Sequence, residues 1–196
     1  MDRCLQIAYV VARAGAWLGG AMIVTAAIIV AIDVIVRKLF VVTLGGANEL
    51  SGYALAVGSA WAFAFALLER AHIRINLLYQ HLPIRLAALL DVLGLLTFTV
   101  FVMLLTRHGY GVFLQSFVAD SHSMSPLGTP LAIPQAMWVL GLALFVAVAL
   151  LLLLRAVFAL VLGDASAVIR LLGTRSTTEE IQHELGEVGT GHGKTE

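Results

Sequence analysis

The sequence has 196 residues, of which 60% are hydrophobic and only 12% are charged, and its 12 Lys and Arg residues balance its 12 Asp and Glu residues. Globular domains are about 45–50% apolar, so the composition excludes a soluble globular protein and indicates a membrane protein. Zero net charge gives no general attraction to nucleic acid, and the single cysteine, Cys4, excludes an internal disulfide and a cysteine cluster for zinc or iron–sulfur.

Four apolar runs are long enough to cross a hydrocarbon core of about 30 Å, which takes about 20 helical residues. We place these spans at residues 14–36, 49–68, 86–106 and 131–154. The predicted fold class is therefore all-α, a polytopic membrane protein with four transmembrane helices. Residues 1–172 are expected to form this domain, and residues 173–196, rich in Gly, Thr, Glu and His, a disordered polar tail. The first run lacks a cleavage site and is interpreted as a retained span.

The distribution of Lys and Arg predicts the orientation of the chain. With four spans, the two tails and the second loop lie on one side of the membrane and carry most of the 12 basic residues. The other side carries Arg37, Lys38 and Arg107. Because basic residues concentrate on the cytoplasmic side, both termini are expected in the cytoplasm.

The first span contains one signal for close helix packing and one for an ion pair. Gly15 and Gly19 form a small-xxx-small pattern, which allows close helix approach in lipid. Near the other end, Asp33 precedes Arg37 by four residues, the favourable order for a helical acid–base pair. A structural ion pair accounts for both charges without a proton relay.

The second span opens with Asn48 and Glu49. We predict that Asn48 caps the helix and that Glu49 is stabilised at the positive end of the helix dipole. Alternatives for Glu49 are a contact with a neighbouring subunit or an ion pair with Arg37 or Lys38.

Small residues line two opposite sides of this second helix. At 100° per residue, residues four apart share a ridge. The first ridge contains Gly52, Ala56, Ala60 and Ala64, and the second contains Ala54, Gly58, Ala62 and Ala66. Because helices associate in lipid through close packing, such a helix is expected to have neighbours on both sides. A four-helix unit provides one such position, but a larger assembly fits more naturally, so these eight residues are predicted to form a subunit interface.

The stretch between the second and third spans, ERAHIRINLLYQHLPIR, alternates charged and apolar residues. Its isoleucines and leucines can enter the acyl boundary while its arginines meet headgroup phosphates, which predicts an interfacial connector. Structural ion pairs or lipid contacts are predicted for Asp33, Arg37, Glu49, Arg70, His72, Arg74, Arg85 and Asp91. Asp91, early in the third span, is also a candidate for function because carboxylates inside a membrane are costly.

The apolar character continues beyond Arg107, so the sequence leaves the end of the third helix open. In the third loop, Pro134 suits the first turn of the last helix, where a missing N–H costs nothing. The last helix is expected to leave the membrane near Arg155, with its end resting on the surface.

Motifs for catalysis or cofactor binding are not found in the sequence. Walker, Rossmann and metalloprotease motifs are missing, and all six histidines fall in loops, span ends or the tail rather than facing each other within spans, as haem would require. We therefore predict no enzyme activity, no cofactor and no metal site.

A series of short motifs resembles one family, the small transmembrane (Q) subunit of tripartite ATP-independent periplasmic (TRAP) transporters, DctQ-like. The motifs are Arg37 with Phe40, Asn48-Glu49-Leu50-Ser51-Gly52-Tyr53, Ala71-His72-Ile73-Arg74-Ile75-Asn76, Leu82-Pro83-Ile84-Arg85, Leu90-Asp91 and Pro130-Leu131-Ala132-Ile133-Pro134-Gln135. Their order and spacing carry the resemblance over residues 14–155. Asn76 is a departure, because the family often has an aspartate there.

The resemblance implies a non-catalytic subunit in the bacterial inner membrane. Its implied partners are a large polytopic subunit that carries an organic acid with sodium ions, a periplasmic substrate-binding protein, and membrane lipids. The outer segment from Gly109 to Thr129 is then a candidate contact for the binding protein. Two alternatives from other classes remain: a small proton-coupled transporter acting alone through Asp33, Glu49 or Asp91, and a membrane anchor or assembly protein of an electron-transfer complex.

Overall fold

The computed structural model describes residues 2–40, 42–43, 45–69 and 82–172. Helices α1 (Asp2–Phe40), α2 (Ala47–Leu68), α4 (Ile84–Val118) and α5 (Ala132–Val161) are each long and apolar enough to cross a membrane, and a short helix α6 (Ala165–Leu172) follows. The all-α fold class with four membrane helices is therefore confirmed. The predicted connector and the polar tail 173–196 lie outside the described residues.

Two helices are much longer than predicted. At 1.5 Å per residue, the 39 residues of α1 and the 35 of α4 extend about 58 Å and about 52 Å, beyond a hydrocarbon core of about 30 Å. The third helix does not stop near residue 106, because its polar side chains bond to their own helix. Thr106 donates to the carbonyl of Val102 at 2.8 Å, and the His108 ring nitrogen lies 2.8 Å from the carbonyl of Leu104. Residues 109–118, predicted as part of the outer segment, are therefore helical.

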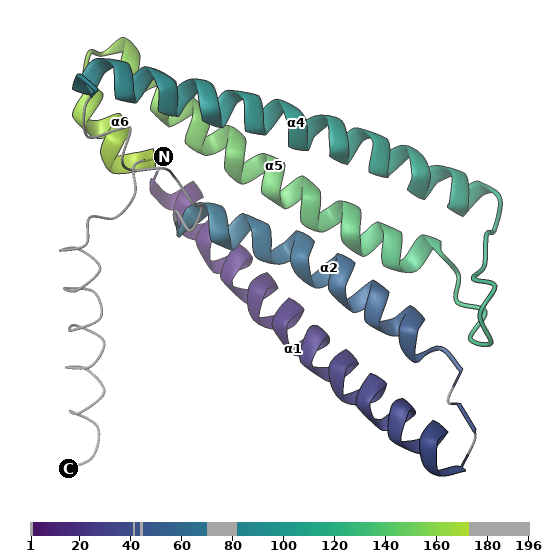
Figure 1. Ribbon diagram of the computed structural model, residues 1–196. Coiled ribbons are helices and arrows are strands. Elements are labelled where there is room, and N and C mark those ends of the chain that lie inside the picture. The colour runs from purple at the N-terminus through teal and green to yellow at the C-terminus, as the bar shows by residue number, and fades with distance from the viewer. Residues whose placement is uncertain (1, 41, 44, 70–81, 173–196) are drawn as a thin grey trace, which may run out of the picture.

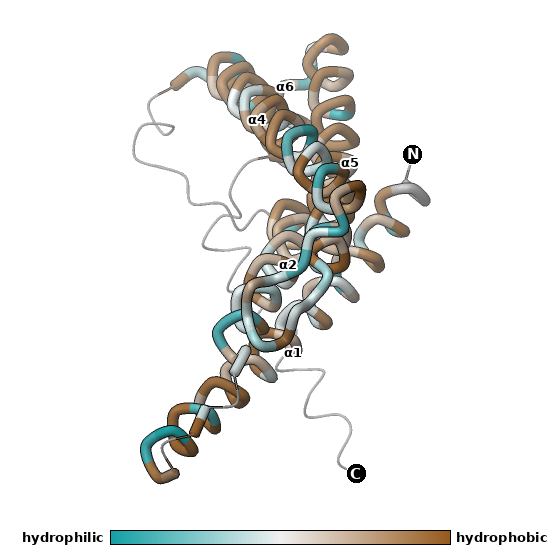
Figure 2. The backbone as a smooth tube through the Cα atoms, turned by 90° about the vertical axis from the view of Figure 1, so that its right-hand side faces the viewer, coloured by the Kyte–Doolittle hydropathy of each residue, from teal (hydrophilic) through white to brown (hydrophobic). Residues whose placement is uncertain are grey.

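The four long helices form an open layer and not a bundle closed on itself (Figure 1). Helix α2 lies between α1 and α5, and α5 lies between α2 and α4. The helices converge at the end where α1 begins and spread toward the opposite end (Figure 1). Large apolar side chains therefore remain exposed along α1 and α4, such as Ile28, Ile35, Phe101 and Leu104. In Figure 2 the hydrophobic colour covers α4 along most of its length. Lipid or another membrane subunit has to cover these surfaces.

The core of the layer is made mostly of small side chains. Ala64, Ala88, Val148 and Ala149 are fully buried, and the cluster to which they belong is concentrated toward the end at which α6 lies. Phe145 of α5 adds aromatic contacts, with ring centroids 5.8 Å from Phe63 and 5.5 Å from Phe98. Small side chains let helix backbones approach closely, which is how helices gain contact energy in lipid.

Helix α5 continues past Arg155 to Val161, and the chain then reverses at Gly163, whose φ of 79° suits a residue without a Cβ. The point at which the last helix leaves the membrane stays a prediction. The Gly163 N–H donates to the carbonyl of Leu160 and the Asp164 N–H to that of Ala159, both at 3.0 Å. Helix α6 then packs back against α4 and α5, with Val168 fully buried.

Candidate functional site

Helices α1 and α2 touch through two glycines. A Cβ built on Gly19 would lie 2.7 Å from the carbonyl oxygen of Gly58, and one built on Gly58 would lie 2.9 Å from the carbonyl oxygen of Gly19. Real Cβ atoms do not come so close to a backbone, so both positions require glycine. The small-xxx-small pattern of the first span therefore marks a helix contact, and its partner is the second helix of the same chain.

Trp61 fills the space that two other glycines leave. A Cβ on Gly15 of α1 would meet the Trp61 ring at 2.6 Å, and one on Gly141 of α5 would meet it at 2.7 Å. The indole Nε1–H donates to the carbonyl of Met137 at 3.0 Å. One side chain of α2 therefore joins the helices on both of its sides, and its polar atom is satisfied by the α5 backbone.

The two ridges of small residues on α2 are used largely within the chain. Gly58 faces α1 through Gly19, and Ala60 faces α5, where a Cβ on Gly141 would lie 3.0 Å from it. The buried ridge residues are Ala54, Gly58, Ala60 and Ala64, the partly exposed ones are Ala62 and Ala66, and the exposed ones are Gly52 and Ala56. The expectation of neighbours on both sides is thus met by α1 and α5. The surface available to another subunit contains Gly52 and Ala56.

The Glu49 side chain connects the start of α2 to the loop between α4 and α5 through a hydrogen bond. The Tyr53 hydroxyl donates to Glu49 Oε1 at 2.6 Å, and the Ser125 hydroxyl donates to Oε2. The prediction that Asn48 caps this helix is wrong: the helix begins at Ala47, with Gly46 at the capping position and no side-chain cap. The carboxylate of Glu49 instead accepts from a segment that lies 76 residues away in sequence.

The loops at this end also pack on each other. A Cβ on Gly45 would lie 3.2 Å from Pro126, and one on Gly46 would lie 2.3 Å from Leu127. Both glycines have positive φ, 60° and 131°, so conformation as well as space favours glycine here. Within the α4–α5 loop, His122 and Pro130 form an isolated antiparallel β-bridge. We refer to these contacts of residues 45–46 and 49 with residues 125–127 as the loop clasp.

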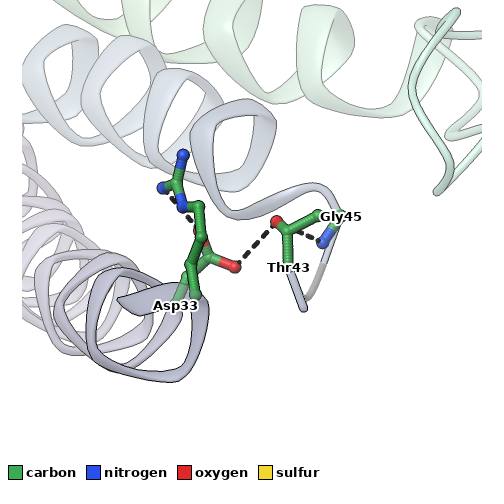
Figure 3. A network of polar contacts seen from close by, with 4 residues as sticks. Asp33, Thr43 and Gly45 are labelled. Carbon is green, nitrogen blue, oxygen red and sulfur yellow. Dashed lines mark hydrogen bonds and ion pairs between the residues drawn. The ribbon is translucent and has the colours of Figure 1, made fainter. Parts of the chain in front are cut away.

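Asp33 organises the end of α1 (Figure 3). Its carboxylate accepts from Arg37 at 2.9 Å and from the Thr43 hydroxyl at 3.0 Å, and the Gly45 N–H donates to the same hydroxyl oxygen at 3.2 Å. Asp33 is 4% exposed, whereas the Arg37 side chain is 55% exposed. The i, i+4 ion pair is therefore present, and it is extended by Thr43 into the loop that leads to α2.

Asp91 is also buried, at 4% exposure. It lies in α4 between Ala88 and Val92, which pack in the same cluster as Val168 of α6. The position is about two turns from the start of α4. Arg85, six residues before Asp91, is exposed.

Sequence reasoning missed one polar contact between α1 and α2. The Tyr9 hydroxyl donates to Glu69 Oε1 at 2.9 Å, and the Tyr9 ring lies 5.7 Å from that of Phe65. The residues are 60 positions apart, so no local pattern could have paired them. Arg70, His72 and Arg74, predicted near this point, lie outside the described residues.

The arrangement of these residues favours a role in helix packing over catalysis or metal binding. Within the described ranges, no group of three or more His, Cys, Asp or Glu side chains could hold a metal ion. Among those same residues, the buried charged side chains are Asp33 and Asp91, each near a helix end.

The Oε1 atom of Gln135, in the first turn of α5 directly after the buried Pro134, is buried without a hydrogen-bond partner in the described part of the chain. Pro134 itself stands in the first helical turn, as predicted.

Comparison with known proteins assigns the chain to a protein family. No curated protein and no solved structure matches it. The sequence model of the tripartite ATP-independent periplasmic transporters, DctQ component, matches residues 26–159, which include the last part of α1, all of α2 and α4, and nearly all of α5. With four membrane helices and well over half of its length matched, the chain belongs to the DctQ family, the small membrane component of TRAP transporters.

Proposed function

We propose that this chain braces the large membrane subunit of a sodium-driven, binding-protein-dependent transporter for organic acids, and that it carries no substrate itself. In this proposal both termini face the cytoplasm, and the loop clasp faces the periplasm. The family match supports the assignment to a transporter. The bracing role, the driving ion and the substrate class are the parts that we add.

The observation that carries the proposal is the open layer. Helix α1 packs mainly on α2, and α4 packs on α5 and the short α6, so many of their large apolar side chains are not covered by the described part of the chain. A transporter that works alone needs helices arranged around a path for its substrate, with polar groups lining the middle of that path. A layer one helix thick favours a role as a wall against which another protein packs.

The positions of the charges support the same conclusion. Asp33 is held by Arg37 and Thr43, and Glu49 by Tyr53 and Ser125. Each carboxylate therefore has a structural partner close to a helix end. Proton coupling would favour a carboxylate near the middle of a span.

The exposed part of α2 is the candidate contact for the large subunit. Among the described residues, a Cβ built on Gly52 meets no atom within 4 Å outside its own stretch of helix, and Ala56 one turn later is also exposed. Small exposed residues let a partner helix approach closely. At the adjacent end, residues 119–131 with the loop clasp are the candidate contact for the periplasmic binding protein.

The test is reconstitution with and without this chain. We expect a tagged chain to co-purify with a large polytopic subunit encoded beside it. Sodium-dependent uptake into proteoliposomes should require both subunits and the binding protein. Uptake by this chain alone would contradict the bracing role, and so would full uptake by the large subunit without it.

A further inference from the structure

A groove of about 410 Å³ lies between α4 and α5, in the second half of α4. Figure 1 shows these two helices running side by side at one edge of the layer. Residues three or four apart share one face of a helix. The groove is lined at this spacing by Met103, Thr106, Arg107 and Tyr110 of α4 and by Val139, Ala143 and Val146 of α5. All of them lie within residues 82–172, which the structure describes without a gap.

The polar side chains of the groove lie at one end of it. A Cβ on Gly109 would be 2.8 Å from the Trp138 ring, so α4 and α5 are level at these two residues. Arg107 and Tyr110 therefore line the end of the groove that is nearer the α4–α5 loop. From Tyr110 the groove extends to Met103, about 10 Å along α4 at 1.5 Å per residue. The groove thus has a polar end toward the loop and an apolar part toward the middle of the two helices.

The polar end offers hydrogen-bond donors without an acceptor for them. Among the described residues, the Arg107 guanidinium makes no ion pair or hydrogen bond, and the Tyr110 hydroxyl makes no hydrogen bond. The Thr106 hydroxyl already donates to the carbonyl of Val102 at 2.8 Å. In the sequence from residue 92 to residue 163, Asp120 in the loop is the only Asp or Glu, so neither wall of the groove supplies an anion. The two available donors indicate a negatively charged ligand.

The position of Arg107 along α4 places this end at the level of the lipid headgroups. From Arg85 to Arg107 the helix rises about 33 Å at 1.5 Å per residue, close to the thickness of a hydrocarbon core of about 30 Å. Arginines near the ends of a span extend toward the interface. The part of the groove from Arg107 toward Met103 then lies beside the acyl chains of one leaflet, which is about 15 Å deep.

We propose that this groove binds a phospholipid through its phosphate. The Arg107 guanidinium and the Tyr110 hydroxyl donate to phosphate oxygens, and one acyl chain lies between Met103 of α4 and Val146 of α5. The N–H groups of a guanidinium match phosphate oxygens in parallel pairs. Every phospholipid carries this phosphate, so the site selects the phosphate and not a particular headgroup. The site goes beyond the bracing function and does not depend on it, because it is formed by this chain alone.

The surface beside the groove favours lipid over a helix of the large subunit as the occupant. Val100, Phe101 and Leu104 of α4 are large and exposed. Helices pack on each other in membranes through small residues, whereas bulky apolar side chains suit a surface covered by acyl chains. Gly52 and Ala56, the small exposed residues assigned to the large subunit, lie on α2 and not on this edge of the layer.

Photo-cross-linking of the full-length chain in detergent tests the proposal. Two probes carry the same diazirine-labelled acyl chain: phosphatidylglycerol, and diacylglycerol, which lacks the phosphate. After irradiation, the labelled peptides are identified by mass spectrometry. We expect phosphatidylglycerol to label residues 103–110 and 139–146 about tenfold more than diacylglycerol does, as expected for a charge-assisted hydrogen bond. Equal labelling of these residues by the two probes would overturn the proposal.

Arg107→Gln tests the contact with the phosphate. Labelling of the groove by phosphatidylglycerol should fall to the level of diacylglycerol, whereas Arg107→Lys, which keeps the charge, should restore part of the difference. Tyr110→Phe keeps the ring and removes the hydroxyl, so labelling should fall by about threefold. Arg85→Gln is the matched control, because Arg85 is exposed on the same helix and does not line the groove. Its labelling should equal that of the unmodified chain.

Ala143→Phe tests the position of the acyl chain without changing the polar end. Ala143 is exposed and lines the groove, so a phenyl ring there should occupy the apolar part and lower the labelling. Ala147→Phe is its control, because Ala147 is exposed on the same helix outside the groove. Unchanged labelling in either Arg107→Gln or Ala143→Phe would overturn the proposal. If Ala143→Phe kept its labelling but lost co-purification with the large subunit, the groove would be a protein contact.

Discussion

Gly19 of α1 and Gly58 of α2 meet backbone to backbone, with each position closed to a Cβ by the carbonyl of the other. This contact fixes how the first two helices cross. It also shows that the α1 side of α2 is already occupied within the chain.

Replacing Gly58 by leucine should separate α1 from α2. The nearest atoms are backbone atoms of Gly19, which cannot move aside as a flexible side chain would, so we expect a loss of at least about 1–3 kcal/mol in unfolding free energy. Thermal unfolding of the purified chain, followed by circular dichroism, measures it. Gly94→Leu is the control, because a Cβ at Gly94 meets no atom of another described element within 4 Å and helix propensity improves. Equal melting of the two variants would contradict the contact.

Enlarging exposed and buried positions of α2 should have different effects. Ala56→Leu changes an exposed residue, so it should lower co-purification with the large subunit roughly tenfold while leaving the stability of the isolated chain unchanged. Ala60→Leu changes a residue that is 1% exposed and faces Gly141, so it should destabilise the isolated chain by about 1–3 kcal/mol. Pull-down of a tagged chain and thermal unfolding separate the two. If Ala56→Leu co-purified normally, the large subunit would have to bind elsewhere.

Removing the hydroxyl of Ser125 should loosen the loop clasp. Loss of its hydrogen bond to Glu49 should cost about 1–3 kcal/mol and speed hydrogen exchange in residues 119–131. Glu49→Ala should have a similar effect, and the double variant should be less destabilised than the two single changes added together. Ser51→Ala is the control, because the Ser51 hydroxyl donates to the carbonyl of Asn48 in its own helix. Additive effects of Glu49→Ala and Ser125→Ala would show that the two groups do not interact.

Neutralising Asp91 should leave ion coupling intact. In Asp91→Asn we expect stability to fall by about 1–3 kcal/mol, because a buried charged group loses its favourable contacts, while uptake by the reconstituted transporter keeps its sodium dependence. Uptake measured against sodium concentration gives the answer. A change in the number of sodium ions coupled to uptake would place Asp91 in the transport mechanism.

Changing Gly163 should release α6 from the end of the layer. With φ at 79°, alanine at this position would be strained by about 1–2 kcal/mol. Asp164→Ala should cost about 1 kcal/mol through loss of the cap that it provides to the N–H of Ala167 at 2.9 Å. Faster hydrogen exchange in residues 165–172 of both variants would agree with this. Ser166→Ala, at an exposed position of α6, should leave the exchange unchanged.

Local features of this fold could be predicted from the sequence, and pairings between distant helices could not. The Asp33–Arg37 pair follows from helical spacing, and the ridges on α2 follow from residue size. In lipid, however, an apolar side chain gains little by choosing a neighbouring helix over an acyl chain, so hydrophobicity does not determine which helices touch. That Gly141 would receive Trp61 depends on α5 lying beside α2, which periodicity does not specify. The Glu49–Ser125 contact likewise requires the order of the helices to be known.

The end of the third helix could not be predicted from the sequence, because the length and the apolar character of the segment do not mark where the helix stops. Thr106 and His108 look like a boundary in sequence, yet each satisfies its polar atom on the preceding turn and lets the helix continue. Helix α5 ends at Val161, shortly before Gly163, whose positive φ does not belong to an α-helix.

The order of the helices in the layer has a consequence for how the chain is made. During synthesis α1 and α2 can pair as soon as both have entered the membrane, because they are neighbours in sequence as well as in space. Helix α4 enters next and finds its place only when α5, the last span, has settled between it and α2. We therefore expect a nascent chain that ends at residue 118 to contain the α1–α2 hairpin and an unpaired α4. Helix α5 then packs between α2 and α4 and connects the two parts.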